Sequence, residues 1–151
     1  MRAGTLLSLA ALALLLGFPA NAQAPAAANG GDPGVNPVRM LDQAEVRVSR
    51  VEIKAGAVRS VHTHDDVRFH LWVPVSGKLE ITIGSAKPVA AADGQAFFLK
   101  KGTPHGFKNV GTTTAVVMEI FVKEGASTAS VAQAQTLAAT FGSLPRPAPG
   151  D

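Results

Sequence analysis

Apolar and polar residues alternate with a period of two through most of the middle of the chain, and this pattern predicts short β-strands. Val46 and Val48 alternate with charged neighbours, and Val51 and Ile53 continue in the opposite phase, which fits one strand with a bulge or two short strands. Further strands are expected around residues 71–75, 79–83, 89–92, 96–99, 105–109 and 116–122.

The expected strands are separated by short segments with turn chemistry. Residues 84–87, Asp93-Gly94 and residues 101–104 contain the glycine, aspartate and proline that tight turns favour. Short strands, closely spaced turns and the lack of a helical period across about eighty residues predict an all-β sandwich or barrel. We place this domain at residues 38–125.

A helical period follows, and we expect a C-terminal helix over residues 126–142. Ser127 or Ser130 suits the N-cap position, and Gly142 suits the end of the helix. We expect residues 143–151 to be disordered. The apolar positions with helical spacing are Val131, Ala134, Leu137, Ala138 and Phe141.

The first residues have the features of a secretory signal peptide. Arg2 precedes an apolar run from Leu6 to Phe18, and small residues follow, so we expect residues 1–22 to be cleaved after Ala22. A membrane anchor is the alternative, but the run is shorter than the roughly 20 residues needed to span a bilayer. We therefore expect a secreted or periplasmic protein that does not bind a membrane after cleavage, with a flexible Ala/Pro/Gly leader at residues 23–37.

Composition narrows the classes of function. The 151 residues carry a formal net charge of +3, and the basic residues are dispersed, which argues against a nucleic-acid partner. The chain has no cysteine, so a disulfide scaffold is excluded and any metal site must use His, Asp, Glu or main-chain ligands.

All four histidines fall within one short window, which makes a shared metal ion the first hypothesis. They are His62, His64, His70 and His105. His62 and His64 point to the same face of an extended strand with Cα atoms about 7 Å apart, so their rings can converge on one ion. The alternative is that His62 and His64 are ordinary exposed polar residues of a strand. His105 would then be half-buried, with its hydrogen bonds satisfied by the protein.

The spacing of glycines around the first three histidines resembles the first motif of the cupin superfamily. Gly56 precedes His62 by five intervening residues, five residues separate His64 from His70, and six separate His70 from Gly77. In cupins, this motif supplies a pair of histidines and a glutamate ligand from adjacent strands of a small β-barrel.

A second stretch resembles the second cupin motif, which ends in the last histidine ligand. Seven residues separate Gly94 from Gly102, two separate Gly102 from His105, and three separate His105 from Asn109. The resemblance covers roughly residues 46–123 and implies a small single-domain, cupin type-2-like protein. Its implied fold is a jelly-roll-like double-stranded β-helix.

The chain departs from the cupin pattern at one ligand position. His70 stands in place of the usual glutamate, one residue later than the commonest spacing, so the resemblance implies a four-histidine site. Asp66 is the alternative fourth ligand, although aspartates in turns often serve turn chemistry. Asn109 is expected to have a structural role.

The implied cofactor is one divalent transition metal ion, either Fe, Mn, Ni, Cu or Zn, since imidazoles suit all of these. An all-histidine site leaves the ion's double charge uncompensated and favours a small anionic chelating substrate. We consider Arg68, Trp72 and Phe107 for substrate binding, with solvated surface as the alternative for the arginine and barrel core for the aromatic residues.

The resemblance implies several functions. A dioxygenase-type metal enzyme is the first hypothesis, and no catalytic base is evident, since only Glu119 and Asp66 are acids with a claim to the site. A non-catalytic cupin that binds a sugar, another small ligand or metal without turnover is the second. A vestigial barrel, in which the histidines do not converge, is the third. Cupins often dimerise, so a homodimer is also expected.

Overall fold

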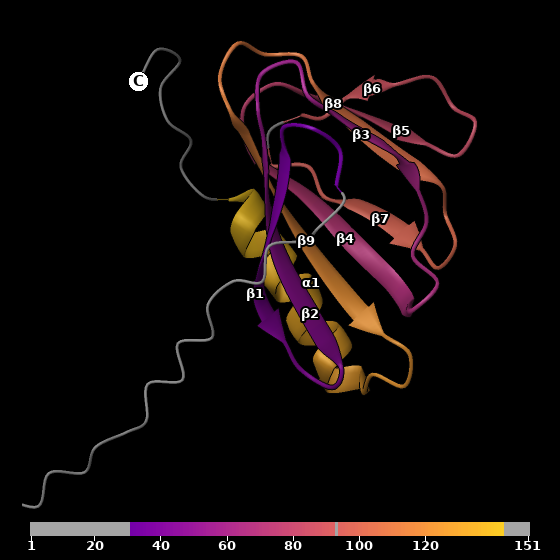
Figure 1. The fold of residues 1–151 in the computed structure, drawn as a ribbon. Coiled ribbons are helices and arrows are strands. Elements are labelled where there is room, and N and C mark those ends of the chain that lie inside the picture. Colours follow the sequence, from indigo (N-terminus) through magenta and orange to yellow (C-terminus); the bar gives the residue numbers. More distant parts are fainter. Residues whose placement is uncertain (1–30, 93, 144–151) are drawn as a thin grey trace, which may run out of the picture.

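The computed structural model describes residues 31–92 and 94–143, which form two antiparallel β-sheets and one helix (Figure 1). The all-β prediction is confirmed. The predicted signal peptide and most of the leader and tail lie outside the described residues. The strands are β1 (Val35–Asp42), β2 (Val46–Ile53), β3 (Val58–His62), β4 (Val67–Ser76), β5 (Leu79–Ile83), β6 (Val89–Ala90), β7 (Phe97–Lys100), β8 (His105–Asn109) and β9 (Ala115–Lys123).

The strands form a five-stranded sheet in the order β1-β2-β9-β4-β7 and a four-stranded sheet in the order β3-β8-β5-β6. In Figure 1 the two sheets face each other like the walls of a flattened barrel, and the helix lies against the five-stranded sheet. This arrangement is a jelly-roll-like barrel, as expected from many short strands.

The five-stranded sheet is covered on both faces, which explains the change of phase in β2. Val46 and Val48 point outward toward α1 (Thr128–Gly142), whereas Val51 and Ile53 point into the barrel. The register from β2 to β9 is continuous, so the bulge expected in this strand is absent. An irregularity lies instead in the neighbouring strand β1, between residues 39 and 41.

Two apolar cores result from this arrangement. The inner core lies inside the barrel and includes Ile53, Trp72, Ile81 and Val117. The outer core lies between the five-stranded sheet and α1, where Ala134 and Ala138 are buried.

The predicted helix is confirmed with small changes at its ends. Ser127 is the N-cap, and its hydroxyl group accepts a hydrogen bond from the Ser130 amide at 3.3 Å. The C-cap is Ser143 and not Gly142. A Cβ atom on Gly142 would lie 2.9 Å from the Gly94 carbonyl oxygen, so glycine allows the helix end to approach that turn.

The expected N-terminal boundary of the domain needs a correction. The leader was predicted to extend to Pro37, but β1 begins at Val35, and Val35 is buried in the inner core. β1 runs antiparallel to β2 from its first residue, which supplies the backbone hydrogen bonds that order this segment. Within the described residues, no helix is long and apolar enough to cross a membrane.

Candidate metal centre

The structure brings the four histidines together between the two sheets. The His62 and His105 ring centres lie 4.4 Å apart, those of His70 and His105 lie 4.7 Å apart, and those of His64 and His70 lie 5.0 Å apart. Ligand atoms of His62, His64 and His105 all lie within 4.8 Å of one another. The convergence that a shared ion requires is therefore present, and a vestigial barrel does not account for it.

Two of the histidines are held in a definite tautomer. His62 Nδ1 lies 2.8 Å from the Ser60 carbonyl oxygen, and His105 Nδ1 lies 2.9 Å from the Thr103 carbonyl oxygen. A carbonyl oxygen only accepts hydrogen bonds, so each Nδ1 is the protonated nitrogen of a neutral ring. Each Nε2 then has a free lone pair, and a backbone partner of this kind is what orients metal-binding histidines.

A bulge in β3 gives His62 its orientation. Arg59 pairs with Phe107 on β8, but His62 pairs with His105, so β3 has one more residue than β8 between these positions. Gly106 lies opposite the bulge, where a Cβ atom would come within 2.8 Å of the Arg59 carbonyl oxygen. The sequence analysis did not identify this glycine, since its role depends on contact across two strands.

Three of the histidines have a buried ring nitrogen without a hydrogen-bond partner. Among the described residues this holds for Nε2 of His64, His70 and His105. Buried polar atoms normally have a hydrogen-bond or metal partner. These three nitrogen atoms therefore indicate a binding partner that is not part of the protein chain. A divalent transition metal ion fits this set of donors, because neutral imidazole nitrogen is among its preferred ligands.

Burial also keeps the imidazoles neutral. It lowers the pKa of His64 to about 4 and that of His70 to about 2, and it lowers the pKa values of His62 and His105 as well. Burial disfavours the charged ring, and the neighbouring histidines add to the effect at His64 and His70. At neutral pH the lone pairs are therefore available without the loss of a proton.

Glu119 is a further acidic group at this centre. Its carboxylate forms a second group with His70 and His105, in which the possible ligand atoms lie within 4.8 Å of one another. Burial raises the pKa of Glu119 to about 7, and the positive charges of Arg59 and Arg47 oppose that rise. From the sequence, Glu119 was expected only as an acid near the site, without a role. Its position inside the barrel depends on the strand register, which the sequence does not reveal.

Asp66, the alternative fourth ligand, is directed elsewhere. Its carboxylate accepts a hydrogen bond from Arg47 at 3.0 Å, and its side chain is 60% exposed. It belongs to neither group of possible ligands, so the structure brings His70, and not Asp66, to the other histidines. Arg47 also stacks on Phe121 with its guanidinium carbon 4.2 Å from the ring centre, a contact that the sequence analysis did not foresee.

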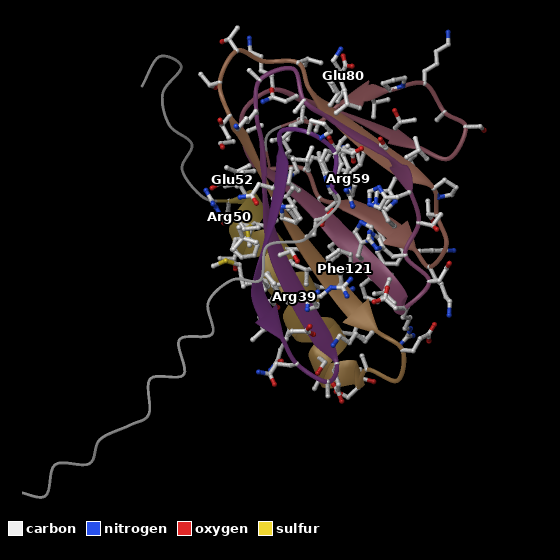
Figure 2. All side chains as sticks on the ribbon, viewed as in Figure 1. Arg39, Arg50, Glu52, Arg59, Glu80 and Phe121 are labelled. Carbon is white, nitrogen blue, oxygen red and sulfur yellow. The ribbon has the colours of Figure 1, made fainter. Side chains whose placement is uncertain are left out.

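The three residues considered for substrate binding lie in different surroundings. Arg68 is exposed on β4, at a register shift between β4 and β9. Trp72 and Phe107 are buried in the inner core with ring centres 5.4 Å apart. Arg59, labelled in Figure 2, pairs with Phe107 in the register of β3 and β8, and its guanidinium group forms an ion pair with Asp32 at 3.2 Å. Its charge also acts on His62 and His105.

Asn109 has the structural role expected of it. Its amide nitrogen donates to the carbonyl oxygens of Ile53 and Thr113, at 2.8 and 2.7 Å, and its oxygen accepts from the Gly111 amide at 2.9 Å. The residue is fully buried and ties β8 to β2. It is thus not a candidate for catalysis.

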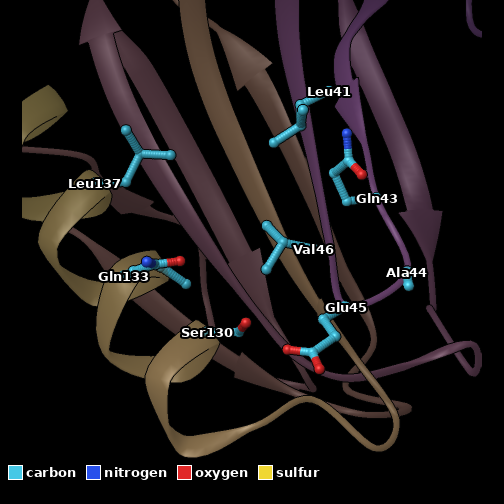
Figure 3. A pocket seen from close by; sticks show the side chains of 9 residues that line it. Leu41, Gln43, Ala44, Glu45, Val46, Ser130, Gln133 and Leu137 are labelled. Carbon is cyan, nitrogen blue, oxygen red and sulfur yellow. The ribbon is translucent and has the colours of Figure 1, made fainter.

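A surface groove beside α1 is separate from this centre. It has a volume of about 440 Å³ and lies between α1 and the β1–β2 hairpin, on the outer face of the five-stranded sheet (Figure 3). Its acidic residue, Glu45, accepts hydrogen bonds from the amide and hydroxyl groups of Ser127 and so serves the start of the helix. The groove contains no histidine.

Comparisons with known proteins agree with this architecture. A cupin domain family model matches residues 49–121. No protein among the curated sequences matches the chain. The family match spans β2 to β9 and includes all four histidines.

Solved structures with the same fold share little sequence with this chain. The cupin domain of Schizosaccharomyces pombe Cnp3 is 18% identical with a TM-score of 0.54, and the match covers 60% of this chain and 65% of that one. A predicted oxalate decarboxylase from Thermotoga maritima is 20% identical with a TM-score of 0.55, over 62% of this chain and 84% of that one. A conserved double-stranded β-helix protein from Klebsiella pneumoniae is 20% identical with a TM-score of 0.56, over 66% and 84%. The family match, the paired sheets and the many cupin neighbours together show that this chain contains a small domain of the cupin superfamily.

Proposed function

We propose that this cupin domain binds one divalent transition metal ion through His62, His64, His70 and His105 and acts as a metal-dependent enzyme on a small anionic chelating substrate. The observation that carries the proposal is the convergence of four imidazoles, three of which have a buried Nε2 atom without a hydrogen-bond partner among the described residues. We further propose that the protein is secreted or periplasmic, because residues 1–22 have the features of a signal peptide.

The charges around the centre support an anionic substrate. The four imidazoles are neutral, so they leave the charge of a divalent ion uncompensated. Arg47 and Arg59 lower the pKa of Glu119, although each is also paired with a carboxylate, Asp66 and Asp32 respectively. A chelating carboxylate or enolate would reduce this excess of positive charge on binding.

Oxygenase-type chemistry is our first choice among the possible reactions. When bound, the ion would polarise a coordinated oxygen and supply open coordination positions for substrate and O₂. The Ser60 and Thr103 carbonyl groups orient the imidazoles of His62 and His105. Near neutral pH, Glu119 is protonated in a fraction of the molecules. Oxalate, which the name of the Thermotoga maritima neighbour suggests, belongs to the same class of chelating anions and is one substrate to try.

The second candidate function is binding without turnover. It is favoured by the small number of acid–base groups, since Glu119 is the one buried carboxylate among the described residues. On this view the barrel holds a small ligand such as a sugar, or retains the metal itself.

Turnover assays on metal-loaded protein distinguish the two functions. The mature protein would be loaded separately with Fe, Mn, Ni, Cu and Zn, and O₂ uptake and substrate loss would be measured with oxalate, hydroxy acids and diketonates. We expect turnover with at least one redox-active metal and its loss in His105→Ala. Stoichiometric metal with no turnover of any of these substrates would favour the binding protein.

A further inference from the structure

The inner face of the five-stranded sheet carries a second polar row, one step deeper in the barrel than His70. The register places Ser49 on β2 opposite Glu119 on β9, and Glu119 opposite Trp72 on β4. Directly opposed residues of antiparallel strands point to the same face, so the three side chains lie side by side. We call Ser49, Glu119 and Trp72 the inner polar row.

Two members of this row have polar groups without a protein partner. The Trp72 indole Nε1 is fully buried and has no hydrogen-bond partner among the described residues. The Glu119 carboxyl group, in a residue that is 7% exposed, makes no hydrogen bond within residues 31–92 and 94–143. An apolar protein core does not leave two adjacent groups of this kind unpaired, because each costs free energy when it is desolvated.

Two members of the row keep a small exposed area, although the third, Trp72, is fully buried. Ser49 is 8% exposed and Glu119 7%, whereas Val117, the next inward residue on β9, is fully buried. The outer face of β9 is covered by α1 and its apolar core, so the accessible surface of Glu119 faces the barrel interior. The small exposed areas of Ser49 and Glu119 therefore lie on the same inner face as His70, which is itself almost fully buried.

The row lies within the reach of a small molecule bound at the metal centre. The carboxylate of Glu119 and the ligand nitrogens of His70 and His105 lie within 4.8 Å of one another. The charged groups that act on Glu119 are Arg59 on β3 and Arg47 on β2. A molecule of a few heavy atoms that chelates the ion therefore brings its far end against the inner polar row.

We infer that the inner polar row binds a hydroxyl group at the far end of the chelated ligand, so that the substrate is a small hydroxylated anion. This inference rests on the proposed metal centre. A carboxyl group has an oxygen that accepts a hydrogen bond in either protonation state, and the indole N–H donates one, so a hydroxyl satisfies both. A second carboxylate at this place would meet the carboxyl group of Glu119 and find fewer donors.

A matched set of hydroxy acids tests the inference. Lactate and glycerate offer the ion the same carboxylate and 2-hydroxyl group, and glycerate adds a 3-hydroxyl group, whereas malate adds a second carboxylate. Binding to the zinc-loaded mature protein would be measured by titration calorimetry. We expect glycerate to bind about tenfold more tightly than lactate, as one good hydrogen bond to a charged group implies, and malate to show no such gain.

Variants locate the effect at the polar row. Glu119→Leu should reduce the glycerate-to-lactate preference to about one with zinc content unchanged, whereas Glu119→Gln should keep part of it, since the amide oxygen still accepts a hydrogen bond. Glu80→Leu is the matched control, because it makes the same change on β5 away from the barrel interior, as Figure 2 shows. Ser49→Ala is a smaller change and should partly lower the preference for glycerate over lactate. It also provides a test of the row if Glu119→Leu does not fold.

Each other outcome overturns the inference in a distinct way. Zinc content that falls in Glu119→Leu would make this residue a metal ligand and not a ligand-binding group. Zinc-loaded protein that binds glycerate and lactate equally, or binds neither, would remove the polar row from substrate recognition while the metal centre stands. Wild-type protein that takes up no metal would overturn both proposals.

Discussion

The two faces of the five-stranded sheet use the same strands for opposite purposes. The outer faces of β4 and β9 present apolar side chains to α1, among them Phe69, Leu71 and Ile120. The inner faces of the same strands present His70 and Glu119. Successive residues of one strand therefore belong alternately to a closed apolar layer and to the candidate metal centre.

The contrast shows how a small barrel without disulfides supports buried polar groups. Burial of unpartnered imidazoles and a carboxyl group costs stability, and burial of apolar surface against the helix offsets it. The helix packs mainly against β4 and β9, on the face of the sheet opposite His70. We therefore expect changes on the inner face to alter metal binding and changes on the outer face to alter stability.

The largest expected effect is the loss of metal from the inner face. His62→Ala/His105→Ala removes two of the proposed ligands, and elemental analysis should show one equivalent of transition metal in the wild type and essentially none in the variant. Because α1 and the outer core are unchanged, circular dichroism should show the same strand and helix content. Equal metal content in both proteins would contradict the assignment of the centre.

A change on the outer face should do the reverse. Ile120 is fully buried in the outer core, so Ile120→Ala should lower the free energy of unfolding by about 2–5 kcal/mol, as measured by urea denaturation. Metal content per folded molecule should stay at the wild-type value. A loss of metal in this variant at a temperature where it is folded would show that the two faces are coupled.

Acid should destabilise the metal-free protein through the inner face. The folded-state pKa values of His64 and His70, about 4 and about 2, lie below the ordinary value of 6.5, so between pH 6.5 and 4 the unfolded chain binds protons that the folded chain does not. Stability therefore falls as pH falls through this window, by the order of 1 kcal/mol per pH unit. The folded-state pKa of Glu119 is raised, so between about pH 4.5 and 7 the folded chain binds a proton at Glu119 that the unfolded chain does not. This contribution raises the stability as pH falls and offsets part of the loss.

Thermal melting of chelator-treated protein at several pH values measures this effect. The variant His64→Gln/His70→Gln lacks the two groups and should give a flatter profile. A wild-type melting temperature that does not change between pH 6.5 and 4.5 would mean that these imidazoles are not buried in the metal-free protein.

The smallest effect is expected at the start of the helix. The Ser127 hydroxyl group accepts a hydrogen bond from the Ser130 amide, so Ser127→Ala should lower the free energy of unfolding by about 0.5–1 kcal/mol. Ser130→Ala, which keeps the amide donor, is the control for the loss of a hydroxyl group. Metal content should not change in either variant.

Much of the fold follows from local patterns in the chain. Alternating residues predicted β2 and β4 to β9 but not β1 and β3. Turn residues separated the predicted strands, and helical spacing with a serine cap predicted α1. The pattern failed in β2, where Val46, Val48, Val51 and Ile53 suggested a bulge. A strand between two apolar layers has apolar residues on both faces, and alternation alone does not distinguish this from a bulge.

By itself the sequence determined that four histidines lie in one window with cupin-like spacing, and that metal ligands must come from side chains other than cysteine. The tertiary structure decided which other groups meet them. Ser49, Glu119 and Trp72 lie far apart in the chain and become neighbours only through the register of β2, β9 and β4. His62 pairs with His105 across a bulge opposite Gly106, and Asp66 is held by Arg47. Register and bulges depend on packing summed over whole sheets, so a local pattern of residues does not determine them.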